Sequence, residues 1–382
     1  MRAESRAFAP LAGKYFTACV LAVILALGSP PDSAPVQREG RPYLVFVRDA
    51  GGGSAAHSDE LWGCDLSGER QFRISNLGEH VVGPVVYSSL SHTLGWWSIR
   101  RQQAVGLPHR LLRVYHLPSR KSKTIYVETK MHPDDLSISP DGQYLLFGRS
   151  RGEFGNGPVE DHGIWQVRID GTGIRSLTRG FGARGRSLYP AISPDGSLIA
   201  FFGYLHEEVG NLCLVDRAGG DSEILSVEIR DFAWYPSGKH LVVAQAGPDD
   251  DAWYTRLAEY EVATRRLRAL TAYRGDSADH TPVFSPDGQR LAYFSSDYRG
   301  QTDANGLKVL SLDGSSVRTI TTGGGLFSSA CAWAPDGESL FYVIRRFEKH
   351  GVDFQIWHAG INGSGRHKVI DHARSPLIVA GL

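Results

Sequence analysis

Short apolar runs, each followed by a tight turn, succeed one another along most of the chain. The clearest turns are the Ser-Pro-Asp-Gly sequences at 139–142, 193–196 and 285–288, and related Pro-Ser-Gly and Pro-Asp-Gly turns stand at 236–238 and 335–337. Proline presets φ at the first central position, aspartate hydrogen-bonds nearby backbone, and glycine accepts a positive φ. Each turn is therefore predicted to reverse the chain between two short antiparallel strands.

The hairpins belong to a longer repeat. A third strand such as 164–168 and a fourth such as 175–178 follow the hairpin at 135–147. The second strand of each repeat is predicted to begin near a position in one series, which runs Tyr43, Thr93, Tyr144, Leu198, His240, Arg290 and Ser339. These starts are 42 to 54 residues apart, the spacing typical of β-propeller blades. The pattern predicts an all-β, seven-bladed β-propeller of four-stranded antiparallel blades, with six blades as the alternative.

The first repeat has no innermost strand ahead of it, so we expect the C-terminal segment 376–382 to supply that strand and close the ring. The repeats over residues 41–382 resemble the WD40-like (PD40) repeats of TolB-like propellers. TolB itself has an α/β domain before its propeller, whereas only 40 residues precede these repeats, so we do not expect such a domain here. The resemblance implies a fold and leaves the activity open, because propellers serve many functions.

The N-terminal residues have a different pattern. Arg2, Arg6 and Lys14 precede an apolar run at 16–27 that ends in small residues, which predicts a signal peptide over 1–28 followed by a linker over 29–40. We therefore expect an extracytoplasmic protein, periplasmic or secreted, with no stable membrane span after cleavage. An uncleaved membrane anchor is the alternative.

Charge and cysteine content narrow the possibilities further. The 41 basic and 41 acidic residues balance, so nothing in the charge favours nucleic acid as a partner. Outside the predicted signal peptide, Cys64, Cys213 and Cys331 lie far apart in apolar strand patterns and are expected to be buried free thiols, with one disulfide plus one thiol as the alternative. Their spacing resembles no metal site, and we expect neither a metal nor a cofactor.

One face of the predicted propeller has the longer connections. The loops between second and third strands are long, at 49–59, 100–109, 149–163, 246–254, 295–306 and 345–353. Because loops carry much of the binding surface of a rigid fold, we expect the ligand on this long-loop face. Residues just before the innermost strands would surround the channel mouth there. This predicted ring consists of His132, Asp134, Arg186, Tyr189, Arg230, Asp231, Asp279 and His280.

Two functions fit this arrangement. The first is a monomeric, non-catalytic binding or scaffold module for a protein, peptide or glycan, because no catalytic motif such as Gly-x-Ser-x-Gly occurs. The second is a channel-sited polysaccharide lyase or hydrolase similar to oligogalacturonate lyase, in which His132 and His280 would act with nearby carboxylates. Convergence of these side chains on one point would favour the enzyme.

Overall fold

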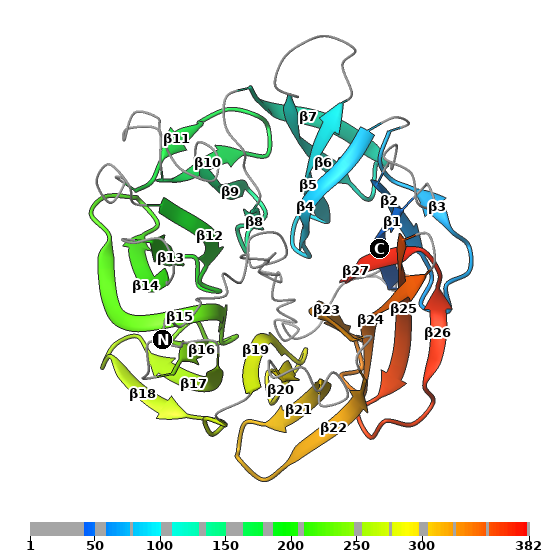
Figure 1. Cartoon of the computed structure of the whole chain (residues 1–382). Helices are drawn as coiled ribbons and strands as arrows, with labels where there is room; N and C mark the ends of the chain where they lie inside the picture. The colour runs from blue at the N-terminus through cyan, green and yellow to red at the C-terminus, as the bar shows by residue number, and fades with distance from the viewer. Residues whose placement is uncertain are drawn as a thin grey trace, which may run out of the picture.

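Every regular element of the described chain is a β-strand, which confirms the all-β prediction. The structure is a computed structural model that describes residues 42–49, 59–76, 79–100, 109–129, 135–149, 163–178, 186–204, 210–247, 254–274, 277–297, 305–323, 326–348 and 351–379. The predicted signal peptide and linker lie outside these residues. Figure 1 shows the sheets arranged as a ring around a central axis.

The first half of the chain forms three four-stranded antiparallel sheets, one of which also takes in β27 from the C-terminal end. Their strands are β1 (Tyr43–Asp49), β2 (Asp59–Cys64), β3 (Phe72–Arg73), β4 (Glu79–Ser88), β5 (Thr93–Arg100), β6 (Arg110–His116), β7 (Lys121–Glu128), β8 (Ser137–Ile138), β9 (Tyr144–Arg149), β10 (Gly163–Arg168) and β11 (Arg175–Ser176).

The second half forms one seven-stranded sheet, β12 to β18, and two four-stranded sheets, β19 to β22 and β23 to β26. The strands are β12 (Arg186–Ile192), β13 (Leu198–Tyr204), β14 (Gly210–Asp216), β15 (Glu223–Trp234), β16 (His240–Ala246), β17 (Thr255–Glu261), β18 (Arg266–Ala269), β19 (Ser277–Phe284), β20 (Arg290–Asp297), β21 (Gly306–Ser311), β22 (Val317–Thr322), β23 (Leu326–Trp333), β24 (Ser339–Glu348), β25 (Gly351–Gly360), β26 (His367–Ile370) and β27 (Ala373–Val379). All seven predicted second-strand starts coincide with the first residue of a strand.

The seven-stranded sheet contains one strand that serves two neighbours. Residues 223–229 of β15 pair with β14, and residues 229–234 pair with β16. The sheet thus consists of two four-stranded units that share β15, and with the other five sheets this arrangement is compatible with seven units. The blade count itself stays a prediction. At the ends of the chain, β27 pairs with β1, where Tyr43 lies opposite Val379.

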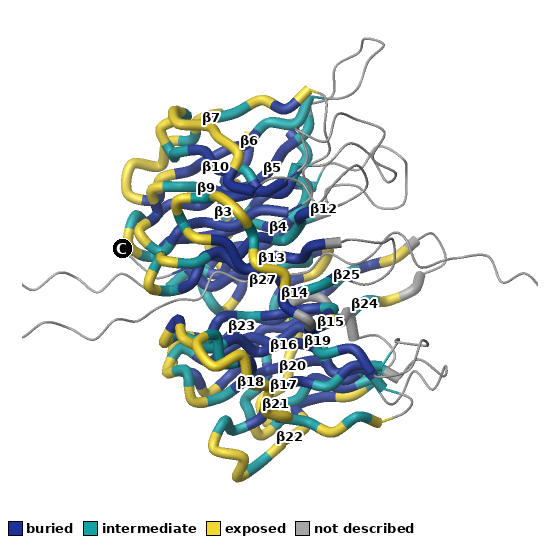
Figure 2. The backbone as a smooth tube through the Cα atoms, turned by 90° about the vertical axis from the view of Figure 1, so that its left-hand side faces the viewer, coloured by how far each residue is buried: buried dark blue, intermediate teal, exposed yellow. Residues whose placement is uncertain are grey.

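The core lies in the gaps between consecutive sheets. On β13, Ile199 and Phe201 pack against the preceding sheet at Leu146, whereas Phe202 packs on the other side with Trp234. Alternate residues of a strand point to opposite faces, so a strand buried on both faces must be apolar at nearly every position. This explains the continuous apolar runs in the sequence. In the side view of Figure 2 the strands are buried along most of their length.

The turns that mark the repeat touch one another. A Cβ added at Gly142 would lie 2.5 Å from Cβ of Ser91 in the preceding unit, and one added at Gly288 would lie 2.9 Å from Cγ of Pro236. Both glycines also have positive φ, 66° and 68°. Glycine is therefore required at these turns for its conformation and for the close approach of the neighbouring turn. Stacked in this way, the turns surround one end of the central axis.

Candidate functional site

A cavity of about 160 Å³ opens along the axis at the end of the molecule where the Ser-Pro-Asp-Gly turns lie. The C-terminal halves of the innermost strands and the turns that follow them form its wall. The lining residues are Val86, Tyr87, Ser88, Ser89, Leu90, Ser137, Ile138, Ser139, Pro140, Ala191, Ile192, Pro194, Phe232, Ala233, Trp234, Pro282, Val283, Phe284, Ser285, Pro286, Ala332, Trp333, Leu377 and Ile378. An apolar cavity of about this volume in another protein takes up benzene, so an aromatic or branched aliphatic side chain is a suitable occupant.

The wall is rigid because its large side chains are fixed by neighbours. Trp234 Nε1 donates to the carbonyl oxygen of Ala191 at 3.0 Å, and Trp333 Nε1 donates to that of Val283 at 2.9 Å. Each bond joins one unit to the preceding one. The polar ends of both indoles are therefore satisfied inside the wall, and a ligand meets a preformed apolar surface.

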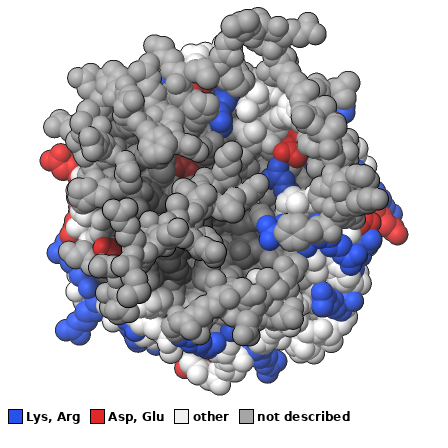
Figure 3. Space-filling view, in the orientation of Figure 1, with Lys and Arg blue, Asp and Glu red and all other residues white. Residues whose placement is uncertain are grey.

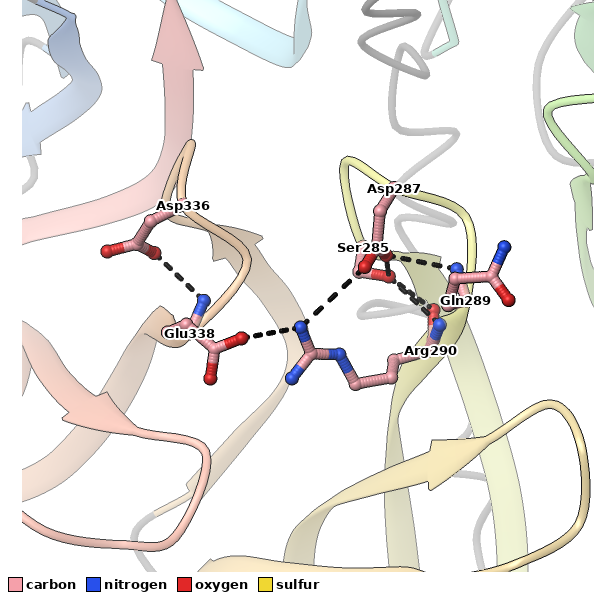
Figure 4. A network of polar contacts seen from close by, with 6 residues as sticks. All are labelled: Ser285, Asp287, Gln289, Arg290, Asp336 and Glu338. Atoms are coloured by element: carbon pink, nitrogen blue, oxygen red, sulfur yellow. Dashed lines mark hydrogen bonds and ion pairs between the residues drawn. The ribbon is translucent and has the colours of Figure 1, made fainter.

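The rim consists of turns that satisfy their own polar groups. Asp287 Oδ1 accepts bonds from Ser285 Oγ at 2.5 Å and from the backbone N–H of Gln289 at 3.0 Å. The hydrogen bond from the Ser285 hydroxyl group is the main reason that the pKa of Asp287 lies below its ordinary value. The hydroxyl group of Ser193 lowers the pKa of Asp195 in the same way. These rim carboxylates are therefore ionised at neutral pH. Figure 4 shows how Arg290 Nη2 continues the rim by donating to Glu338 of the next turn at 2.8 Å.

Two turns of the rim depart from the pattern, one with Ser237 and one with Leu90 in place of aspartate. Four turns carry aspartate at the second turn position, at 141, 195, 287 and 336, whereas the turn after β4 carries Leu90 there. Leu90 lines the cavity and is 63% exposed. In the four aspartate turns this position holds a carboxylate that hydrogen-bonds within its own turn. The exposed leucine instead adds apolar surface at the mouth of the cavity.

The cavity lies at the end of the axis opposite the predicted ring. His132 and Asp134 lie outside the described residues. Arg186 begins β12, where its backbone pairs with Tyr204, and Arg230 lies half-buried in β15. The long-loop face appears in Figure 3, where the described Lys and Arg side chains lie mostly around its outer edge.

Two buried aspartates connect consecutive units through backbone N–H groups. Asp231, in the ring, accepts from the N–H of Phe232 at 2.8 Å and from that of Thr281 at 3.0 Å. Asp135, which we did not predict as a site residue, accepts from the N–H of Gly148 and from that of the ring member Tyr189, each at 2.5 Å. Thr281 and Tyr189 both have positive φ and both precede proline. These carboxylates therefore hold strained strand bulges in place, a structural role.

The two remaining ring members, Asp279 and His280, are neighbours on β19. His280 has Thr281 Oγ1 3.0 Å from its Nδ1 and Ser296 Oγ 3.0 Å from its Nε2, and burial lowers its pKa to about 4. Its imidazole is neutral near pH 7, with both nitrogens occupied by hydroxyl groups. Asp279 is also buried, and its backbone carbonyl oxygen accepts from Thr255 Oγ1 at 2.6 Å, whereas its carboxylate Oδ1 has no hydrogen-bond partner among the described residues. Within the described ranges, no three His, Cys, Asp or Glu residues are grouped to hold a metal ion.

The Asp231 carboxyl group gives a testable pH dependence. Burial raises its pKa to about 7, although the hydrogen bonds from the N–H groups of Phe232 and Thr281 lower it. An unfolded aspartate titrates near pH 4. Between these values the folded state holds a proton that the unfolded state lacks, so the stabilising contribution is complete below pH 4 and is lost as the pH rises through 7.

We expect the free energy of unfolding to fall with pH in this window by at most about 1.4 kcal/mol per unit from this group. The Asp231→Asn variant cannot titrate there and should show a shallower dependence. Urea denaturation of both proteins from pH 4.5 to 8 measures the difference. Parallel curves for the two proteins would show that Asp231 does not titrate in this range.

The three cysteines match the prediction of buried free thiols. Cys64, Cys213 and Cys331 are each buried, and none of the three is part of a disulfide. Burial raises the pKa of Cys64 and that of Cys213 to about 12, so these two thiols are protonated and unreactive near neutral pH. None of the described elements is a helix of the length and apolar character that a bilayer crossing needs.

Comparison with known proteins places the fold. No family model matches the chain. A TolB homologue of Chlorobium luteolum is 31% identical over 137 residues, which are 35% of this chain and 29% of that protein. TolB from Acinetobacter baumannii matches with a TM-score of 0.53 and 14% identity over 88% of this chain and 66% of its own. An oligogalacturonate lyase in complex with manganese matches with a TM-score of 0.59 and 11% identity, over 88% and 87% of the two chains.

A ring of antiparallel, mostly four-stranded sheets around an axial cavity defines this protein as a β-propeller. The repeat turns, the sequence match to a TolB homologue and the fold match to TolB make it a TolB-like β-propeller. The chain spans less than a third of the length of the TolB homologue that it matches, so these comparisons establish the fold and leave the activity to be proposed.

Proposed function

We propose that the protein is a non-catalytic binding propeller that takes a protein or peptide segment into the axial cavity through an apolar side chain. The observation that carries this proposal is that Trp234 and Trp333 and the exposed Leu90 all line the same cavity. A preformed apolar pocket with a few polar groups around it is the usual form of a binding site. The site differs from the long-loop face that we predicted from loop length.

A defined peptide library tests this function. Twelve-residue peptides displayed on phage would be selected on the full chain, and the selected peptides measured by isothermal titration calorimetry. We expect Leu90→Asp to weaken their binding at least tenfold, because it places a charge against the apolar side chain of the ligand. Val317→Asp is the matched control, since Val317 is a 52% exposed apolar residue on the outer strand β22. Equal effects of the two substitutions would contradict the cavity as the binding site.

The alternative is a channel-sited polysaccharide lyase, which the fold match to oligogalacturonate lyase favours. Among the described residues the neutral, doubly bonded His280 and the structural role of Asp231 speak against it. Metal analysis of the purified protein, with an assay of oligogalacturonate cleavage, separates the two functions. Stoichiometric metal together with cleavage would replace the binding proposal by the enzymatic one.

The cellular location is part of the same proposal. We propose an extracytoplasmic monomer from which residues 1–28 have been removed, on the basis of the basic start and the apolar run at 16–27. The N-terminal residue of protein recovered from expressing cells, determined by mass spectrometry, tests this point.

A further inference from the structure

The described chain begins at the wall of the axial cavity. Its first strand, β1, starts at Tyr43, opposite Val379, and the next residue, Leu44, lies opposite Ile378. Ile378 lines the cavity. β1 is a second strand, and the second strands of the other units begin directly after the turns that form the rim. Whatever precedes Pro42 is therefore tethered at the rim itself.

The tethered segment has the chemistry of an extended apolar ligand. Residues 29–41 read Ser-Pro-Pro-Asp-Ser-Ala-Pro-Val-Gln-Arg-Glu-Gly-Arg. Proline-rich sequences favour the polyproline II conformation, which extends about 3.1 Å per residue and loses little entropy when it binds an aromatic-lined groove. The six residues from Pro42 back to Val36 reach roughly 19 Å, and Pro35 and Val36 are the apolar groups nearest the tether. The segment is present whether or not residues 1–28 are removed.

Charge also matches. Arg38, Glu39 and Arg41 lie between the apolar pair and the tether, which gives this stretch a net charge of +1 next to the rim. The rim holds carboxylates whose pKa is lowered, among them Asp195 and Asp287. Opposite charges at the mouth would orient the segment, with its apolar part toward the cavity.

We propose that residues 29–41 fold back into the axial cavity and act as an intramolecular ligand that a partner must displace. This inference rests on the proposed function, because it makes the same cavity the site of competition. A short tether gives an effective concentration in the millimolar range, so even a weak contact occupies the cavity for most of the time. A partner would then bind with an apparent affinity equal to its intrinsic affinity multiplied by the fraction of molecules in which the cavity is empty.

Disulfide trapping in the full chain tests where the segment lies. The variant with Val36→Cys and Ser89→Cys places one thiol in the segment and one in the cavity wall. The three native cysteines of the propeller are buried and do not compete. The control pairs Val36→Cys with Thr129→Cys, an exposed residue at the long-loop end of β7. We expect mild oxidation to form the first disulfide at least tenfold faster than the second, and equal rates would overturn the proposal.

A second measurement tests competition. In the full chain, Pro30, Pro31, Pro35 and Val36 would be replaced by serine, and a synthetic peptide of residues 29–41 added in trans. We expect this peptide to bind the substituted chain at least tenfold more tightly than the native chain, because the native cavity is already occupied. Equal affinity for the two chains, or no binding to either while library peptides do bind, would overturn self-occupation and leave the proposed function standing. If neither the synthetic peptide nor any library peptide bound either chain, the proposed function would be overturned as well.

Discussion

Replacing Asp135 by alanine is expected to lower the free energy of unfolding by about 3 kcal/mol. The carboxylate of Asp135 is 2% exposed and accepts from the N–H of Gly148 and from that of Tyr189, the latter in the next unit. Alanine leaves both N–H groups buried without these acceptors, and each orphaned donor costs roughly 1–3 kcal/mol. Tyr189 also loses the contact that holds its φ at 55°.

Urea denaturation followed by tryptophan fluorescence measures this loss. Asp135→Asn should fall between the native protein and Asp135→Ala, because the amide keeps one acceptor and turns a donor toward the other N–H. Asp221→Ala is the matched control, since Asp221 is an exposed carboxylate in a turn and its removal should change stability by less than about 0.5 kcal/mol. If Asp135→Ala and Asp221→Ala were equally stable, the Asp135 carboxylate would not be holding the bulge at Tyr189.

The Trp234→Ala variant is expected to be about 4 kcal/mol less stable than the native protein. Trp234 is 2% exposed and packs between two units of the seven-stranded sheet, where its Nε1 donates to Ala191. Removing the indole opens a large void in a close-packed interface and leaves the carbonyl oxygen of Ala191 without this bond. The void would join the axial cavity, because Trp234 also forms part of its wall.

The Trp234→Phe variant separates the two contributions. Phenylalanine keeps most of the apolar contact and loses the hydrogen bond, so we expect a loss of about 1–2 kcal/mol. Thermal and urea denaturation of both variants provide the measurement. A loss of the same size in Trp234→Phe and Trp234→Ala would assign the stability of this interface to the hydrogen bond and not to packing.

The candidate site lies at the end of the axis opposite the face that the sequence favoured. Short, repeated turns indicated a structural face, so the binding prediction went to the long loops opposite. In the structure the prolines of those turns, at 140, 194 and 286, line the axial cavity. One signal was visible beforehand, namely Leu90 at a turn position where four other repeats have aspartate. Its meaning depended on knowing that all the turns meet around one axis.

The predicted ring stays a prediction, because two of its members, His132 and Asp134, lie outside the described residues. Polar residues ahead of the innermost strands fit a channel mouth, and their spacing in the sequence is regular. A carboxylate in that position can face solvent or bond a neighbouring backbone, and the sequence of one strand does not distinguish the two. Asp231 bonds the N–H of Thr281, 50 residues further along the chain, a contact that exists only after two units pack together.

The sequence by itself determined the strands and their turns. Proline, aspartate and glycine fix a tight turn through local backbone chemistry, and apolar residues at nearly every strand position require burial on both faces. For this reason the seven second-strand starts could be predicted to the residue. Only the tertiary structure decided which turns surround a cavity, which aspartates hold bulges between units and which strands share a sheet. These depend on contacts between residues about 50 positions apart, and a local pattern does not encode which distant groups meet.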